Sequence, residues 1–352
     1  AMLRSLVGSE MCIRDSYYSM QGHADKCVEK YCELAGSSMD SLKAVATPSL
    51  LDNQISAEEF AAKGKLSSVA ARIVLKILFF ARIARPDVLG VCNQLSREVT
   101  KWTTACDRRL LRLISYIHHT KAFVIKCMVG DPYEDLKLAV YSDASFAGDS
   151  GDSKSTTGGF LCLVGPRTFV PLNWICKKQG AVSHSSTEAE IIGLDTMMRM
   201  EGIPALNLWS QIISTISGKK LISRKAEPKE SAYERYDRIS LEYADYVPPS
   251  MPELEANSKC VFVQDNDAVI KMVIKARAPM LKHVARTHRI DLECLFERLS
   301  TDPAIYGRYI HTKLQIADIL TKGHFTSEQW NALCSLLRLG LPPSSHIAKQ
   351  IK

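Results

Sequence analysis

The chain contains 352 residues, of which 46% are hydrophobic, and it carries a formal net charge of +7. This length can hold two domains with packed cores. The longest apolar stretch, 69–84, is excluded as a membrane span because it contains Arg72, Lys76 and Arg82, and no secretory signal is evident. Eleven cysteines without a CxxC pair are typical of reduced thiols in the cytosol or nucleus. The positive charge suits a nucleic-acid partner without requiring one.

The first segment, 1–20, is expected to be adapter-derived or disordered. Residues 3–16 lack a convincing apolar periodicity and resemble the translation of a cDNA-library adapter, so we exclude them from the fold prediction. The chain begins with Ala1, which suggests a fragment of a longer reading frame.

The second segment, 21–130, is predicted to be helical. Ser56 and Glu59 have the spacing of a capping box, which marks the start of a helix. The predicted helices are a short one within 17–48 and longer ones over 57–84, 87–99 and 105–119. The residues alone assign no role to this helical segment.

Strands are predicted to follow the helical segment. Apolar and polar residues alternate from residue 136 to Asp143, and a polar turn then leads to a second strand over 159–164. A third strand is predicted over 171–178. Ser185, with Glu188 three residues later, then caps the start of a long helix.

Residues 218–258 differ from the rest, because they are charged, contain prolines and have few periodic apolar positions. We therefore expect a disordered insertion there. The later elements are predicted as a strand over 259–264, helices over 268–275 and 290–299, a strand over 305–311, a helix from about 316 and a last helix over 327–338. Three consecutive strands followed by alternating elements predict an α/β fold, in which one mixed sheet is flanked by helices over 134–325 and followed by a C-terminal helix and tail over 326–352.

Four acidic residues stand where such a sheet can bring them together. Asp143 and Asp265 end predicted strands, whereas Glu190 and Asp318 lie in early turns of predicted helices. Four carboxylates at one sheet edge suit hard divalent ions such as Mg²⁺. Two such ions roughly 3.5–4 Å apart would activate water and stabilise the leaving oxygen of a phosphodiester. Taken singly, each acid is explained equally well as a strand end or a helix cap; their joint placement favours metal binding.

Six motifs resemble, in this order, the ribonuclease H domain of Copia-type LTR-retrotransposon polyproteins: YSDASFAGD, KSTTGGFL, NWICKKQ, SSTEAEI, QDNDAVI and ADILTK. The resemblance covers roughly 134–325 and is interrupted by the insertion. Two upstream motifs, ARPDVLGVCNQLSR and LLRLISYIHHT, resemble the segment that joins reverse transcriptase to ribonuclease H in the same polyproteins. The sequence contains no Tyr-x-Asp-Asp polymerase motif.

The resemblance implies a ribonuclease H-like five-stranded mixed sheet whose substrate is the RNA strand of an RNA–DNA hybrid. It further implies that Asp143, Glu190, Asp265 and Asp318 form a metal-binding tetrad for two Mg²⁺ ions, with Mn²⁺ as a possible substitute. The implied partner is the reverse transcriptase domain of the same polyprotein, in a cytoplasmic virus-like particle or the nucleus, with no membrane partner.

The sequence departs from the family pattern in two places. It has His288-Arg289-Ile290-Asp291 where the family usually has Lys-His-Ile-Asp. The insertion over 218–258 is also long for the family. Neither departure alters the four acids.

Two further features are candidates for the site. A basic stretch that contains Lys282, Arg286 and Arg289 is expected to hold the backbone of the hybrid, although a solvated charged surface explains any single residue about equally well. His311 lies seven residues before the last acid, where many ribonucleases H place a histidine that assists proton transfer or product release. The Copia-type pattern usually has proline at this position, so a solvent-facing strand-end histidine is the favoured interpretation.

The leading hypothesis is a metal-dependent endonuclease that cuts RNA in RNA–DNA hybrids. One alternative is an integrase or transposase, which shares the fold but places its essential glutamate last; here the glutamate is second and an aspartate is last. The other alternative is a catalytically inactive remnant of a decayed element, which would only bind nucleic acid or brace the polymerase. The four intact acids argue against it.

Overall fold

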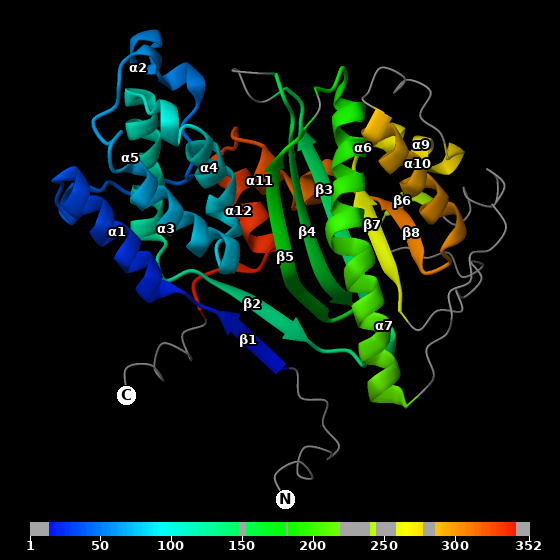
Figure 1. Cartoon of the computed structure of the whole chain (residues 1–352). Helices are drawn as coiled ribbons and strands as arrows, with labels where there is room; N and C mark the ends of the chain where they lie inside the picture. Colours follow the sequence, from blue (N-terminus) through cyan, green and yellow to red (C-terminus); the bar gives the residue numbers. More distant parts are fainter. Residues whose placement is uncertain are drawn as a thin grey trace, which may run out of the picture.

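The computed structural model describes residues 14–147, 153–180, 182–218, 240–243, 258–276 and 286–342. Within these ranges nine strands form one sheet, in the order β1-β2-β5-β4-β3-β7-β8-β6, with β9 paired to β2. Helices cover both faces: α1–α5, α11 and α12 lie on one side, and α6, α7, α9 and α10 lie on the other (Figure 1). The predicted mixed sheet with flanking helices is confirmed.

Five central strands form the part of the sheet that the motifs predicted. The first three are antiparallel neighbours, and the last two continue the sheet with parallel pairing, β7 beside β3 and β8 beside β7. Their bounds are β3 Lys137–Ser145, β4 Thr156–Gly165, β5 Thr168–Lys178, β7 Cys260–Gln264 and β8 Ile305–Tyr309. Every residue of β7 is buried, as expected for a strand that is covered on both faces.

Four short strands were not predicted: β1 Arg14–Tyr18, β2 Val124–Val129, β6 Ser240–Tyr243 and β9 Leu339–Gly340. Two of them lie in segments where disorder was expected. β1 falls in the excluded N-terminal segment, yet it pairs with β2, and Asp15 forms an ion pair with Lys126 at 3.0 Å. β6 falls in the insertion and pairs with β8 at the opposite edge of the sheet. Residues 1–13, most of the insertion and the tail from 343 lie outside the described residues.

The predicted helix over 57–84 is two helices. Ser56 and Glu59 do form a capping box, but the helix they start, α2, ends at Ala61. The helix ends there, and Ala62 has an extended backbone. The N–H of Gly64 then donates to the carbonyl of Trp102 at 3.1 Å. A Cβ at this glycine would lie 2.5 Å from a backbone oxygen, so a larger residue would not fit. The observed helices of this segment are α1 Gln21–Ala35, α2 Ala57–Ala61, α3 Ala70–Ile83, α4 Pro86–Arg97 and α5 Thr104–His119.

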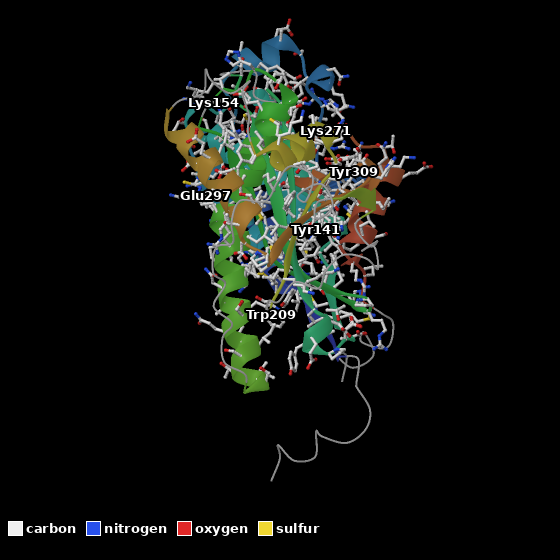
Figure 2. The ribbon with its side chains drawn as sticks, turned by 90° about the vertical axis from the view of Figure 1, so that its right-hand side faces the viewer. Tyr141, Lys154, Trp209, Lys271, Glu297 and Tyr309 are labelled. Carbon is white, nitrogen blue, oxygen red and sulfur yellow. The ribbon has the colours of Figure 1, made fainter. Side chains whose placement is uncertain are left out.

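The long helix predicted after Ser185 is interrupted by a single π-helical turn, Met198–Gly202. The N–H of Ile203 donates to the carbonyl of Met198, five residues back. Pro204 explains the turn, because proline has no N–H and its ring clashes with the carbonyl four residues earlier. The helices on this face are α6 Ser186–Met197, α7 Ile203–Ser217, α9 Asp267–Lys275 and α10 Arg286–Thr301; α7 extends past the end of the sheet and carries Trp209 (Figure 2).

The helical segment and the sheet share one hydrophobic core. Side chains of α1, α3, α4 and α5 are buried together with those of β2, β4, β5 and two C-terminal helices, α11 Asp318–Thr321 and α12 Ser327–Leu336. The indole N–H of Trp174 on β5 donates to the carbonyl of Ala81 on α3 at 2.9 Å. No helix within the described ranges is long and apolar enough to cross a membrane.

A buried ion pair joins the helical segment to the C-terminal helix. Arg85 and Asp87 are 1% and 0% exposed and contact each other at 2.7 Å. The hydroxyl of Tyr116 donates to Asp87 at 2.9 Å, and the indole of Trp330 on α12 donates to that hydroxyl at 3.0 Å. A network of this kind is stable only while each charge keeps its partner.

We predict that Asp87→Asn lowers the free energy of unfolding by about 3–5 kcal/mol, because it leaves the Arg85 guanidinium buried without a counter-charge. Urea unfolding of the whole chain measures this. The control is Glu33→Gln, which removes the exposed 2.9 Å pair with Lys30 and should cost about 1 kcal/mol or less. Equal losses in the two variants would contradict the role of this network.

Candidate metal centre

Asp143 lies two residues before the end of β3 and is 2% exposed. Its position across the sheet, on β4, is Gly158. A Cβ at Gly158 would lie 2.5 Å from the methyl group of Thr321, so the missing side chain lets α11 pack directly on the sheet beside the acid. Asp143 is thereby placed between a strand and a helix that come from distant parts of the sequence.

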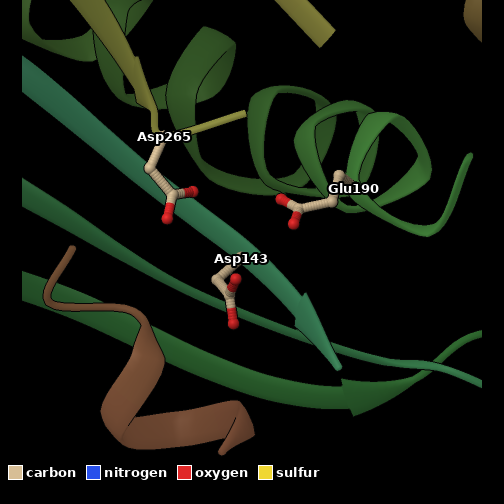
Figure 3. Close-up of side chains that lie close together, drawn as sticks. All are labelled: Asp143, Glu190 and Asp265. Atoms are coloured by element: carbon tan, nitrogen blue, oxygen red, sulfur yellow. The ribbon is translucent and has the colours of Figure 1, made fainter. Parts of the chain in front are cut away.

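Glu190 and Asp265 approach Asp143 from two other elements. Glu190 lies in the second turn of α6, whose start is capped by the Ser185 hydroxyl at 3.1 Å from the Glu188 N–H. Asp265 follows directly after β7, the parallel neighbour of β3. One carboxylate oxygen from each of the three acids lies within 4.8 Å of the others (Figure 3).

Asp318, the first residue of α11, lies next to this triad and is linked to it through Lys322. The Lys322 ammonium is 2.7 Å from Asp318 Oδ2 and 3.7 Å from Asp143 Oδ1. The hydroxyl of Thr321, on the same helix, donates to Asp143 Oδ2. The structure therefore brings three of the predicted acids into one cluster. The fourth, Asp318, lies beside the cluster, and the Lys322 ammonium lies between it and Asp143.

One buried glutamine contacts an acid, and a second contacts the strand that carries Asp143. The side-chain amide of Gln264 donates to Glu190 at 2.6 Å and accepts from the Ser142 hydroxyl at 3.0 Å. Gln315 donates to the carbonyl of Ser142 at 3.1 Å. The side chains of Gln264, Gln315 and Ser142 are fully buried, so their rotamers are fixed by packing as well as by hydrogen bonds.

Four further residues of this site were not predicted: Gln264, Gln315, Thr321 and Lys322. Two of the quoted motifs contained the signal: QDNDAVI starts with Gln264, and ADILTK ends with Thr321 and Lys322. A polar residue directly beside a candidate ligand at a strand end is a possible orienting group. That reasoning would have found Gln264.

Burial, together with neighbouring carboxylates, raises the pKa values of Asp143, Glu190 and Asp318. Burial, together with the Asp143 and Asp265 carboxylates, raises the pKa of Glu190 to about 8. Burial and the nearby Asp143 raise the pKa of Asp318 to about 7, against the opposing effect of Lys322. Burial also raises the pKa of Asp143. Burial alone would lower the pKa of Lys322, but Asp143 and Asp318 outweigh it and hold that pKa above its ordinary value.

The donor set fits a hard divalent cation. Asp265 Oδ1 and Asp318 Oδ1 are buried oxygens without a hydrogen-bond partner. Carboxylate oxygens are the ligands that Mg²⁺ and Mn²⁺ bind most readily in proteins. A cation among these acids would supply the missing partners and relieve the repulsion among the carboxylates.

The other predicted site residues stay predictions. His311 is exposed, and its Nδ1 accepts from the N–H of Lys313 at 3.2 Å, so it caps a short 3₁₀ turn, Thr312–Leu314. Lys282 lies outside the described residues, and Arg286 and Arg289 lie in α10 with side chains that the structure does not describe.

Comparison with known proteins finds relatives over part of the chain. A retrovirus-related Pol polyprotein from transposon RE1 of Arabidopsis thaliana is 31% identical over 157 residues, which is 45% of this chain and 10% of the relative. A second such polyprotein from Arabidopsis thaliana, from transposon RE2, is 32% identical over 158 residues, again 45% of this chain and 10% of the relative. Secreted RxLR effector protein 161 of Plasmopara viticola is 30% identical over 129 residues, 37% of this chain and 82% of that protein.

The chain thus spans about a tenth of the length of the Pol polyproteins that it matches. No protein-family model and no solved structure matches it.

We predict that the metal-free protein loses stability as the pH rises from 4.5 to 8. In this window the folded protein keeps a proton on Glu190 that the unfolded chain has lost, because the pKa of Glu190 is about 8 in the folded state against 4.5 for the free group. Raising the pH therefore favours unfolding, by a few kcal/mol at most, since one pKa unit corresponds to about 1.4 kcal/mol.

Urea unfolding in EDTA at several pH values measures this slope. Glu190→Gln should reduce the slope and leave the part that Asp318, with a pKa of about 7, contributes, while Glu58→Gln, on the exposed helix α2, should leave the slope unchanged. Adding Mg²⁺ at pH 8 should stabilise the wild-type protein and not Glu190→Gln to the same extent. An identical slope in all three proteins would show that the carboxyl cluster does not control this titration.

Proposed function

The chain belongs to the Copia-type retrovirus-related Pol polyproteins of transposons, and from this premise we propose that its sheet domain is a ribonuclease H. The reaction is the metal-dependent hydrolysis of the RNA strand in RNA–DNA hybrids formed during reverse transcription. The observation that carries the proposal is the cluster of Asp143, Glu190 and Asp265, whose oxygens lie within 4.8 Å of one another.

In this proposal the four acids hold Mg²⁺ or Mn²⁺, with Asp143 shared between the triad and Asp318. Bound cations of this kind activate water for attack on the phosphodiester and stabilise the leaving oxygen. The chain's own contribution is to fix the ligands: Gln264 orients Glu190, and Thr321 orients Asp143. Orientation by buried groups of this kind is worth one to two orders of magnitude in metal affinity or activity, that is about 10–100-fold.

A cavity of about 1170 Å³ beside the acids supports a polyanionic substrate. It lies between the helical segment and the sheet, and its lining runs from Thr321 and Lys322 at the site to α4. Basic side chains from both parts line it, namely Arg97, Lys101, Arg109, Lys178, Lys322 and His324. Three acidic side chains, Asp52, Asp87 and Glu98, also line the cavity, and Arg109 forms an ion pair with Asp52. In this proposal the other basic side chains bind the phosphate groups of one strand. The basic stretch with Lys282, Arg286 and Arg289 is proposed as a further backbone contact.

An integrase places its essential glutamate last among its acids. Here the glutamate, Glu190, is the second of the four acids and the last is Asp318, so the integrase alternative is disfavoured. A remnant without activity would have no reason to retain buried, mutually repelling carboxylates together with the amides that orient them. The reverse transcriptase domain of the same polyprotein is the proposed partner, in a cytoplasmic particle or the nucleus.

We predict that Asp143→Asn and Asp265→Asn each lower Mg²⁺-dependent cleavage of the RNA strand by more than about 10²-fold, the scale of losing a key electrostatic stabiliser. The amide keeps the shape of the side chain but removes the charge that holds the cation. The measurement is gel analysis of a hybrid labelled on either strand, with double-stranded DNA as a second substrate.

The matched control is Asp267→Asn, two residues from Asp265, which pairs with Lys271 on the exposed face of α9. It should cleave at the wild-type rate. Wild-type cleavage by Asp143→Asn, or no cleavage of the hybrid by the wild-type protein in Mg²⁺, would exclude the proposed activity.

A further inference from the structure

Lys322 occupies a place among the acids that a divalent cation would also favour. Its ammonium contacts both Asp318 and Asp143, at 2.7 and 3.7 Å. The carboxyl groups of these acids are 8% and 2% exposed, so the ammonium faces two nearly buried oxygens. Asp318 Oδ1 lies buried there without a hydrogen-bond partner. Two carboxylates thus share one ammonium at the Asp143–Asp318 corner of the site, and one carboxylate oxygen there lacks a partner.

A second aspartate–lysine pair in the same protein shows that this arrangement is not an ordinary helix-surface pair. Asp267 and Lys271 on α9 have the same spacing of four residues and a similar distance of 2.6 Å (Figure 2 labels Lys271). Their side chains are 59% and 55% exposed, and they are a pair of the kind that contributes little to stability. The Asp318 side chain is about seven times less exposed than that of Asp267. The ion pair with Lys322 therefore compensates for the water contacts that the Asp318 carboxylate loses on burial.

The other side of Lys322 opens to solvent. Its side chain is 38% exposed and lines the cavity of about 1170 Å³ that also contains Lys101 and Lys178. A flexible four-carbon stem lets the ammonium turn from the acids toward this cavity. A phosphate held in the cavity carries one negative charge, as the Asp318 carboxylate does, and could pair with the ammonium in its place.

We propose that Lys322 is a tethered counter-cation that holds the Asp143–Asp318 corner until a nucleic-acid phosphate in the cavity attracts it, and that a divalent cation then takes its place. The inference rests on the proposed function. With the ammonium, the two carboxylates of this corner carry a net charge of −1. The divalent cation that replaces the ammonium neutralises both carboxylates, and the phosphate neutralises the ammonium that has turned away. The ammonium and a divalent cation repel each other at these distances, so the corner holds one of them at a time.

The exchange predicts how many ions the protein binds. Without nucleic acid, the wild-type chain binds one divalent cation tightly, at Asp143, Glu190 and Asp265, and the second site is closed by Lys322. With nucleic acid in the cavity it binds two. The order of events thus ties completion of the metal centre to the arrival of a phosphate backbone.

The test counts Mn²⁺ ions on the full chain by calorimetry and by electron paramagnetic resonance. Three variants are compared with the wild type: Lys322→Met, which keeps the length of the stem without the charge, Lys322→Arg, which keeps the charge, and Lys271→Met, the matched control. In the absence of nucleic acid, Lys322→Met should bind a second ion at least about tenfold more tightly than the wild type. The other two variants should bind ions as the wild type does.

The same titrations are repeated with a duplex of DNA and 2′-O-methyl RNA, which carries the phosphates but resists hydrolysis. The duplex should raise the wild-type count from one ion to two and leave Lys322→Met at two. Equal ion counts and affinities for the wild type and Lys322→Met, or no second ion in Lys322→Met, would overturn the proposal. If Lys322→Met does not unfold cooperatively on heating, Lys322→Gln replaces it.

The two proposals fail separately. If the wild type cleaves hybrids but the ion counts of wild type and Lys322→Met agree, the exchange is wrong and the ribonuclease assignment stands. If the counts differ as expected and no hybrid is cleaved, the exchange stands and the ribonuclease assignment is wrong.

Discussion

The repulsion among closely spaced carboxylates is the constraint on which the rest of this structure depends. Asp143, Glu190 and Asp265 are held with their oxygens within 4.8 Å, and Asp318 adds a further charge beside Asp143. Such a cluster is unfavourable without a cation, as the raised pKa values of Glu190 and Asp318 indicate. The protein retains it because the surrounding packing overrides the local cost, which is typical of a site kept for chemistry rather than for stability.

Two hydrophobic cores, one on each face of the sheet, supply that packing. β3 lies between them: α6 packs on one side through Gly193, and α11 packs on the other beside Gly158. The first core includes the helical segment, so α4, whose Gly90 contacts the carbonyl of Leu320, supports the helix that carries Asp318. α4 thus supports the acids indirectly, through its packing against the helix that carries Asp318 and Thr321.

Much of this arrangement could be predicted from residue patterns, because strand ends and helix caps have local signals. Alternation placed Asp143, and the serine cap placed Glu190 within α6. The early end of α2 and the partners of the acids were missed, because they depend on contacts between distant residues. The N–H of Gly64 donates to the carbonyl of Trp102, and Gln264 donates to Glu190, only once the fold brings these residues together. β1 was missed because five residues of polar and aromatic character gain their structure only by pairing with β2.

Anomalous diffraction from crystals of the full chain soaked in Mn²⁺ would show whether these acids form a divalent-cation centre. We expect an anomalous peak bounded by the carboxylates of Asp143, Glu190 and Asp265, at coordination distances of about 2.0–2.2 Å for a small divalent ion. We also expect the Asp143→Asn crystal to lack this peak. The absence of a peak among these three acids at saturating Mn²⁺, with ions bound only elsewhere, would show that the acids are not a divalent-cation centre.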